Sequence, residues 1–397
     1  MKILWITDSL PQAHSGGAAT IYYNLIKQVA RHHQVVLASL AHSSEEEREA
    51  RTLSGFCQRI ETVVVRKGRR SLRKAVRVLT SDAPPLNRHF WSEELAARIR
   101  RVCGEERIDV VQIEHAYMAP YVHCVGGGGT PRRVLSFHNI GRTYYRRLIA
   151  LEKRPRLKAE LVLGWLRSRR WERRILRHFD ACLTLSTHDW RQLDAEAQRK
   201  GHVVPHGIDT EALQPLAETP ESQELLMVGN MSYIANEDAL RFFAKRIFAD
   251  IRAEVPGVHV TVVGRNPPRD ISEGFAPDAF TITGGVDSVT PYYRRAALLA
   301  VPLRAGSGVR GKILEAMALG RPVVSTTIGC EGLDVTHGKE LLIADRPSDF
   351  AGCTLQLLRN PALRATLREA GRRLVETQHG WSKVADKLLR VYAGLAS

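Results

Sequence analysis

Residues 296–326 read AALLAVPLRAGSGVRGKILEAMALGRPVVST, and this stretch contains the local pattern that decides the fold. The apolar run at its start predicts a buried strand, RAGSG a loop, and VRGKILEAMAL a short helix. Gly320 suits the left-handed position after a helix, and Pro322 prevents the helix from continuing. The run PVVST then predicts a second strand. Strand, helix and strand in this order favour a parallel sheet with a right-handed crossover.

The same alternation continues over most of the 397 residues. Unbroken rather than alternating hydrophobicity indicates strands that are buried on both faces of parallel sheets. Residues 203–223, rich in Pro, Gly and polar side chains, interrupt the alternation as an interdomain linker does. The sequence therefore predicts an α/β fold of two doubly wound, Rossmann-like domains, residues 1–205 and 206–375, facing a central cleft that holds the ligand.

Composition narrows the class of partner and the compartment. The formal charge is +16, which favours an anionic partner: nucleic acid, an acidic membrane surface or a phosphorylated ligand. No apolar run approaches the roughly 20 residues that span a bilayer, and the start MKILWITD lacks the pattern of a signal peptide. The six cysteines are scattered without CxxC spacing, which predicts reduced thiols, a cytoplasmic protein and no structural zinc.

The helix in the opening stretch has two distinct sides. Lys312 and Glu315 lie together on a helical wheel, and Ile313, Leu314 and Met317 cover the opposite side. The apolar side is expected to dock on the sheet. A lysine for phosphate and a carboxylate for paired sugar hydroxyls would together bind a sugar nucleotide. A simple ion pair on the surface explains the same spacing, and the residues alone leave both interpretations open.

Glycine loops at two helix starts favour anion binding. Gly308 precedes the predicted helix, whose free N–H groups and dipole attract phosphate, and Arg310 and Lys312 reinforce that bias. Gly16 and Gly17, in SLPQAHSGGAAT after the first strand, permit a similar close approach. An ordinary strand–helix turn also suits glycine.

Polar side chains follow several predicted strands at their carboxyl ends. His138 ends RRVLSFH, and Glu114 and His115 end the strand in QIEHAYM. Arg265 and Asn266 follow VHVTVVG. The carboxyl ends of parallel strands form the ligand-binding edge of such sheets. Strand-end hydrogen bonding and a plain β-turn are the structural alternatives.

Several motifs taken together resemble the retaining glycosyltransferases of family 4, with the GT-B fold. They are LEAMALGRPVVST, VVPHGID and VVGRNPP. The segments MVGNMSYIANEDALRFF and VPLRAGSGVRGKILEAMA are similar to the branch associated with exopolysaccharide and exosortase gene clusters. The resemblance covers essentially the whole chain. It implies that residues 376–397 form a helix that returns to the first domain.

The resemblance also implies roles for the candidate residues. Glu315 holds the donor ribose, the first-domain glycine loop faces the donor, and His138 lies at the reaction centre with Glu114 and His115 on the acceptor side. The family often has a second glutamate where this chain has Ser307, and its usual phosphate-binding Arg and Lys are absent from GNMSYIAN. Ser307, Gly308, Arg310 and Lys312 are therefore expected at the donor, with Arg310 and Lys312 as substitutes for diphosphate binding.

The expected reaction is sugar transfer from a nucleotide sugar, with retention, to a saccharide or lipid-linked acceptor. No two aspartates form a DxD motif, so we expect no metal and no cofactor besides the donor substrate. A sugar-nucleotide epimerase is the enzymatic alternative. A nucleic-acid-binding protein fits the charge, but the sequence shows none of the usual nucleic-acid motifs, and a dehydrogenase lacks GxGxxG after a strand.

Basic residues concentrate in residues 66–77 and in residues 157–179. The second segment predicts a helix with an apolar arc, formed by Leu161, Trp165, Ile175, Leu176 and Phe179. The neighbouring arc is basic, and it contains Arg167, Arg169, Arg170, Arg173, Arg174 and Arg177. We expect this face to dock on an anionic membrane. A core-packed helix with a solvated basic face is the alternative.

Overall fold

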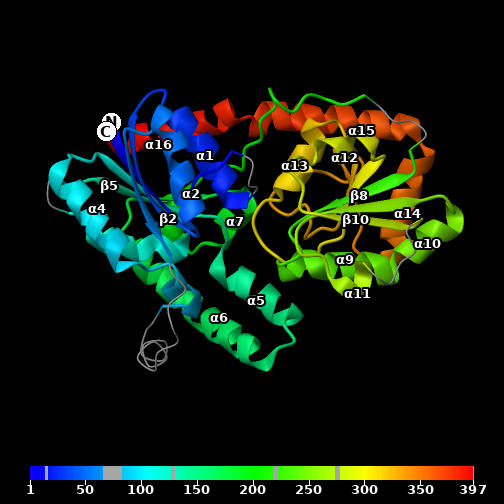
Figure 1. Ribbon diagram of the computed structural model, residues 1–397, viewed down its shortest axis with the longest axis horizontal. Helices are drawn as coiled ribbons and strands as arrows, with labels where there is room; N and C mark the ends of the chain where they lie inside the picture. Colours follow the sequence, from blue (N-terminus) through cyan, green and yellow to red (C-terminus); the bar gives the residue numbers. More distant parts are fainter. Residues whose placement is uncertain (14–16, 66–82, 127–129, 218–221, 273–277, 397) are drawn as a thin grey trace. The chain divides into compact units, whose positions relative to one another are not determined.

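In the computed structural model the chain forms two compact units (Figure 1). The first comprises Met1–Ile149, Arg154–His206 and Trp381–Ser397, and the second comprises Ala150–Lys153 and Gly207–Gly380. The structure describes residues 1–13, 17–65, 83–126, 130–217, 222–272 and 278–396. The basic segment 66–77 and Gly16 therefore lie outside the described residues.

A seven-stranded parallel sheet is the centre of the first unit, in the order β3-β2-β1-β4-β5-β6-β7. The strands are β1 Lys2–Thr7, β2 Gln34–Ala41, β3 Arg59–Val64, β4 Val110–Glu114, β5 Arg132–Phe137, β6 Ala181–Thr184 and β7 Gly201–Val203. The order reverses between β1 and β4, where Ile6 pairs with Ile113. Residues that follow these two strands thus meet at the switch point where open α/β sheets bind ligands.

Helices and short turns connect these strands. They are α1 Gly17–Val29, α2 Ser44–Glu49, η1 Ala50–Gly55, η2 Pro85–His89, α4 Glu93–Glu105, η3 Ala116–Cys124, α5 Gly141–Leu151, α6 Pro155–Leu176, α7 Thr187–Gln192, α8 Ala195–Arg199 and α16 Trp381–Ala396. Helix α16 packs against α1. Its buried residues are spaced three or four apart, as in a helix with one apolar side, and are Trp381, Val384, Ala385, Leu388, Val391 and Tyr392.

The second unit repeats the topology with six parallel strands, in the order β10-β9-β8-β11-β12-β13. The strands are β8 Glu224–Val228, β9 His259–Val263, β10 Phe280–Gly284, β11 Leu298–Val301, β12 Val323–Ser325 and β13 Leu342–Ile343. Here the order reverses between β8 and β11, where Leu226 pairs with Leu299. The loops after these two strands form the corresponding switch point.

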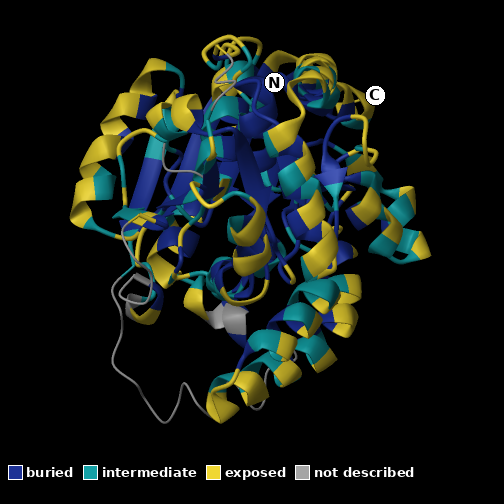
Figure 2. Ribbon diagram, turned by 90° about the vertical axis from the view of Figure 1, so that its right-hand side faces the viewer, coloured by how far each residue is buried: buried dark blue, intermediate teal, exposed yellow. Residues whose placement is uncertain are grey.

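The helices of the second unit cover a sheet whose central strands are largely dark blue, and therefore buried, in Figure 2. They are α9 Ile234–Arg246, α10 Phe248–Glu254, α11 Arg269–Ser272, α12 Thr290–Arg295, α13 Gly311–Ala318, α14 Pro347–Arg359, α15 Pro361–Leu374 and the π-helical turn η4 Val375–His379. Phe243 and Phe350 are fully buried and contact each other edge to face. The predicted architecture of two parallel α/β sheets is confirmed.

The long basic helix is present, but the predicted apolar arc is partly wrong. Helix α6 ends at Leu176, so Phe179 lies outside it, and Leu161 and Trp165 are only half-buried. The buried side is formed by Gly164, Ser168, Trp171, Ile175 and Leu176. The reason is close packing on α5: a Cβ at Gly164 would lie 2.5 Å from the Tyr145 ring. Small residues therefore face the neighbouring helix, and larger apolar ones are left at the surface.

None of the helices in the described part of the chain is long and apolar enough to cross a membrane.

Candidate functional site

A buried carboxylate–imidazole pair lies at the carboxyl edge of the first sheet. Glu114 is the last residue of β4, and His138 follows β5. The Nε2 atom of His138 lies 2.8 Å from Oε2 of Glu114, and the residues are 5% and 1% exposed. Burial alone would raise the pKa of Glu114, but hydrogen bonds from His138 and Gln112 outweigh it and lower that pKa. The glutamate is therefore an ionised acceptor that fixes the imidazole.

The other oxygen of Glu114 accepts two further hydrogen bonds. Its Oε1 accepts hydrogen bonds from Nε1 of Trp5 in β1 and from Nε2 of Gln112 in β4, each at 2.7 Å. The Tyr392 hydroxyl of α16 hydrogen-bonds Oε1 of Gln112. Four elements that are far apart in sequence thus surround one buried charge.

A second carboxylate, Asp8, follows β1 at the same switch point. Its two oxygens accept hydrogen bonds from the hydroxyls of Tyr22 at 2.7 Å and Tyr117 at 2.8 Å. Burial, reinforced by the charge of Asp8, raises the pKa of both tyrosines well above their usual value. Both phenols therefore stay protonated, and they hold the Asp8 carboxylate in one orientation.

His115 lies between these groups in an uncommon backbone conformation. Its φ is 68°, in the left-handed region that non-glycine residues rarely adopt. Its ring is 4.1 Å from the His138 ring, between centroids, and stacks on Tyr117 at 4.6 Å. Burial and the neighbouring His138 hold the pKa of His115 well below its usual range, so this imidazole is neutral. The structure brings His138 together with Glu114 and His115, which the sequence marked as an adjoining pair on another strand.

The glycine loop of the second unit has the predicted course into α13. Gly306 and Gly308 have φ values of 102° and 77°, which only glycine adopts readily. The Arg310 guanidinium turns back on this loop and donates to the carbonyl oxygens of Ser307 and, at 2.6 Å, Gly308. Arg310 thus holds the conformation of the loop before α13 through hydrogen bonds to its carbonyl oxygens.

Lys312 and Glu315 lie on the predicted side of α13, and Ile313, Leu314 and Met317 are buried on the other. No ion pair joins Lys312 to Glu315 among the residues described, so a surface ion pair does not explain them. Each has a different partner, and the partner of Lys312 ties it to the loop after β8.

Lys312 Nζ donates to Oδ1 of Asn236 at 3.0 Å, and Asn236 Nδ2 donates to the carbonyl of Asn230, in the loop after β8. The Tyr293 hydroxyl lies 3.3 Å from Oε2 of Glu315. Burial lowers the pKa of Lys312 to about 7 and raises the pKa of Glu315 to about 7. An ammonium and a carboxylate poised near neutrality thus lie beside the start of a helix.

The remaining predicted donor residues lie at loop positions. Arg265 and Asn266 are exposed after β9, and Asn266 has a φ of 58°. The Asn266 side chain donates to Oγ of Ser232 at 2.6 Å, which ties the loop after β9 to the loop after β8. Gly17 is the first residue of α1.

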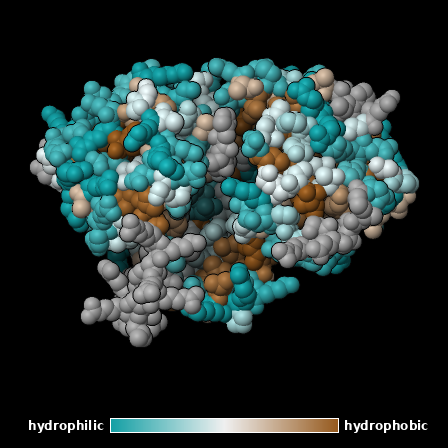
Figure 3. Space-filling view, viewed as in Figure 1, coloured by the Kyte–Doolittle hydropathy of each residue, from teal (hydrophilic) through white to brown (hydrophobic). Residues whose placement is uncertain are grey.

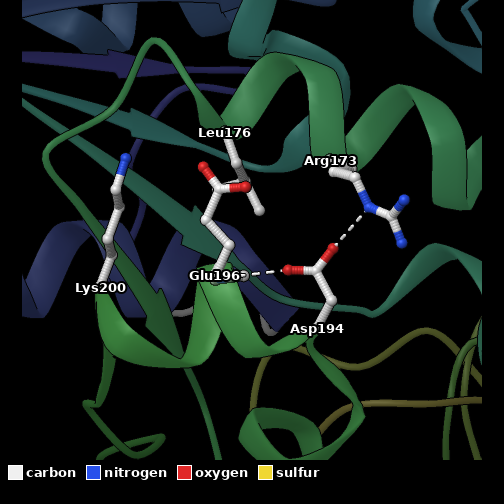
Figure 4. A pocket seen from close by; sticks show the side chains of 6 residues that line it. Arg173, Leu176, Asp194, Glu196 and Lys200 are labelled. Carbon is white, nitrogen blue, oxygen red and sulfur yellow. Dashed lines mark hydrogen bonds and ion pairs between the residues drawn. The ribbon is translucent and has the colours of Figure 1, made fainter.

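A surface hollow between α6 and α8 is unrelated to both switch points (Figure 4). Arg173 and Asp194 form an ion pair across it at 3.0 Å, and Lys200 and Glu196 flank them. Asp194 also accepts a hydrogen bond from the backbone N–H of Ala197. Arg173 is therefore held in place by an ion pair within its own unit.

Comparison with known proteins assigns the chain to a family. The family described as Glycosyltransferase Family 4 matches residues 15–212, and that described as Glycosyl transferases group 1 matches residues 222–360. The chain belongs to these glycosyltransferases. A glycosyltransferase thus presents two polar switch-point clusters, with Glu114, His115 and His138 in the first matched segment and Lys312 and Glu315 in the second.

Curated relatives of this glycosyltransferase are distant. A 44.6 kDa protein of the cps region of Klebsiella pneumoniae is 24% identical over 270 residues, 64% of this chain and 66% of the relative. A lipopolysaccharide core biosynthesis mannosyltransferase of Rhizobium meliloti is 27% identical over 213 residues, 48% of this chain and 59% of the relative. The chain therefore spans less than two thirds of the length of these relatives.

Solved structures show the same fold across the whole chain. Sucrose-phosphate synthase from Thermosynechococcus elongatus has a TM-score of 0.73 at 16% identity, and 100% of this chain and 99% of that one are covered. An Anabaena protein solved in complex with UDP has a TM-score of 0.67 at 14% identity, with 99% and 100% covered. At these identities the likeness establishes only the fold of this glycosyltransferase.

Several polar residues of the two clusters were not identified from the sequence. Asp8 had a usable signal, since it directly follows the first buried strand at the carboxyl edge. Asn236 and Tyr293 had no such signal, because they contact Lys312 and Glu315 of α13 from other helices. Gln112 and Tyr392 are also invisible to local patterns, since they are 280 residues apart.

The lowered pKa of Lys312 in this glycosyltransferase can be tested in the absence of any ligand. Lys312 should titrate near pH 7, because burial disfavours its charged form. Asn236→Asp places a carboxylate beside Nζ and should raise that midpoint by at least one unit. The measurement is an NMR titration of isotope-labelled lysine, with Lys312→Met to assign the signal. A wild-type midpoint near the ordinary lysine value would contradict the account.

Proposed function

We propose that this protein transfers a sugar from a nucleotide-sugar donor to a saccharide or lipid-linked polysaccharide precursor, with retention of anomeric configuration and without a metal. The observation that carries the proposal is the α13 cluster: Lys312, Glu315 and a glycine loop meet at the switch point of the second sheet. A diphosphate requires cations and free N–H groups, and a ribose requires an acceptor of two hydroxyl hydrogen bonds.

The comparisons support a nucleotide-sugar donor and a saccharide product. The Anabaena protein was solved with UDP and with UDP-glucose, and the Rhizobium meliloti relative is named a mannosyltransferase of lipopolysaccharide core biosynthesis. Both matching families are glycosyltransferases, which does not favour the epimerase or the nucleic-acid-binding alternative.

In this mechanism Lys312, the loop N–H groups and the start of α13 stabilise the nucleoside diphosphate as it departs. Arg310 holds the glycine loop in shape through the carbonyls of Ser307 and Gly308. Glu315 holds the ribose hydroxyls, and Arg265, Asn266 and Gly17 border the donor. His138, fixed by Glu114, lines the reacting sugar, and His115 contributes on the acceptor side.

The donor site is tested with UDP as the probe. Glu315→Gln should weaken UDP binding at least ten-fold, because a charge-assisted hydrogen bond is worth about 1.5–3 kcal/mol. The Glu315 contribution to affinity should also disappear as the pH drops below about 7, because protonated Glu315 loses acceptor strength. Protonation of Lys312 over the same range favours the diphosphate, so the Glu315 component is measured as the difference between wild type and Glu315→Gln. The variant should lack that component. Calorimetry between pH 5.5 and 8, roughly one unit to either side of the Glu315 pKa, measures both effects.

The matched control is Glu376→Gln, an exposed glutamate of the same unit that pairs with Arg372. It should bind UDP as the wild type does. Equal affinity and equal pH dependence in Glu315→Gln and wild type would remove Glu315 from the donor site.

We also propose that helices α5 and α6 dock on the anionic cytoplasmic face of a membrane, which brings the protein to a lipid-linked acceptor. Residues 141–177 hold thirteen Lys or Arg against three Glu, a formal +10 of the chain's +16. Val162 and Leu166, one turn apart on α6, are 37% and 63% exposed. Figure 3 shows hydrophobic surface over these helices, bordered by hydrophilic side chains. Basic and exposed apolar side chains together are typical of a lipid interface.

The membrane proposal is tested by sedimentation with lipid vesicles. The wild type should bind vesicles of phosphatidylcholine with phosphatidylglycerol, but not pure phosphatidylcholine, and salt should weaken the binding. Arg169→Glu with Arg170→Glu should reduce binding at least ten-fold, because each basic residue near the surface contributes about 1 kcal/mol. Leu166→Ser should reduce it further.

The charge-matched control is Lys245→Glu with Arg246→Glu, exposed at the end of α9. That pair should leave vesicle binding unchanged. Equal loss in both pairs would show that net charge alone acts, and absence of binding by the wild type at low salt would refute the proposal.

A further inference from the structure

The C-terminal helix reaches the Glu114–His138 pair through a continuous chain of buried hydrogen bonds. The chain runs from the Tyr392 hydroxyl to Gln112 Oε1, from Gln112 Nε2 to Glu114 Oε1 at 2.7 Å, and from Glu114 Oε2 to His138 Nε2 at 2.8 Å. All four residues are at most 5% exposed. Tyr392 belongs to α16, which lies in the first unit although it ends the chain.

The chemistry of the four side chains fixes which group donates and which accepts in each of these hydrogen bonds. An ionised carboxylate only accepts, so Gln112 must present its NH₂ to Glu114 and therefore its carbonyl to Tyr392. The tyrosine must then donate. On the other side of the carboxylate, the bond at Nε2 requires that this nitrogen of His138 carries a proton. A flipped Gln112 amide would place two acceptors together inside the protein, which is costly.

We propose that Tyr392 and Gln112 are positioning residues, through which helix α16 fixes the ring orientation and the proton position of His138. The inference rests on the proposed role of His138 in transfer. Among the described residues, the His138 ring contacts Glu114, the neutral His115 and the edge of Tyr22, whose hydroxyl is committed to Asp8. Tyr22 belongs to α1, which packs on α16, but Glu114 is joined to α16 by side-chain hydrogen bonds.

The proposal makes α16 part of the functional site rather than only a packing element. Without the Tyr392 hydroxyl, the Gln112 carbonyl loses its donor, and Glu114 alone holds the amide. An amide held at one end can tilt away from Glu114, which would loosen the carboxylate and its hold on His138. Turnover should fall while the donor cluster, which lies in the second unit, is unaffected.

The test is Tyr392→Phe in the full chain, which keeps the ring and removes only the hydroxyl. NMR of isotope-labelled histidine, assigned with His138→Gln, reports which ring nitrogen is protonated. The wild type should show His138 with a proton on Nε2. The variant should show that signal shifted and averaged between tautomers, with turnover of a nucleotide sugar reduced five-fold or more and UDP affinity within two-fold.

The control is Tyr121→Phe, a buried tyrosine of the same unit whose hydroxyl bonds Phe90 and Ser92 instead. It should leave the His138 signals unchanged. Gln112→Leu is the second variant and should move the His138 signals in the same way as Tyr392→Phe. Wild-type His138 signals in a folded Tyr392→Phe or Gln112→Leu protein would overturn the inference.

The hydrogen-bond chain and the role of His138 in transfer can be contradicted independently of each other. Altered His138 signals with unchanged turnover would support the hydrogen-bond chain and remove His138 from the reaction. A lower melting temperature with unchanged His138 signals would assign Tyr392 a structural role only.

Discussion

The Glu114 carboxylate is a charge enclosed inside the sheet of the first unit, and its surroundings must donate to it. An unpaired buried carboxylate would be strongly destabilising. Trp5, Gln112 and His138 donate to it, and they come from β1, β4 and the end of β5. The need to satisfy one charge therefore sets the relative positions of three strands and the imidazole at their edge.

Topology explains why polar residues gather at two places. Each sheet has the same order of its first six strands, and each reverses that order next to its first strand. In the first unit the reversal brings Asp8 beside Glu114 and His115. In the second unit it brings the loop after β8 beside the glycine loop and α13. The first cluster offers fixed acceptors and a positioned imidazole, and the second offers a cation, a carboxylate and the start of a helix.

The sequence was sufficient where the information is local. Apolar runs and the Gly320–Pro322 stop predicted the strands and α13, and the helical wheel placed Lys312 and Glu315 on the correct side. It was insufficient where partners are distant: Asn236 for Lys312, Tyr293 for Glu315 and Tyr392 for Gln112 follow no periodic pattern. The α6 arc was misassigned because Gly164 and Ser168, small and weakly hydrophobic, face the close contact with α5.

The central claim is that the fixed imidazole of His138 serves sugar transfer and not folding. It is tested most directly by the turnover of the nucleotide sugar that best stabilises the wild-type protein, compared among wild type, His138→Ala and the exposed-site control His123→Ala. The account predicts that His138→Ala loses more than ten-fold in turnover, with UDP affinity preserved, and that His123→Ala retains wild-type turnover. Wild-type turnover by a folded His138→Ala protein would contradict it.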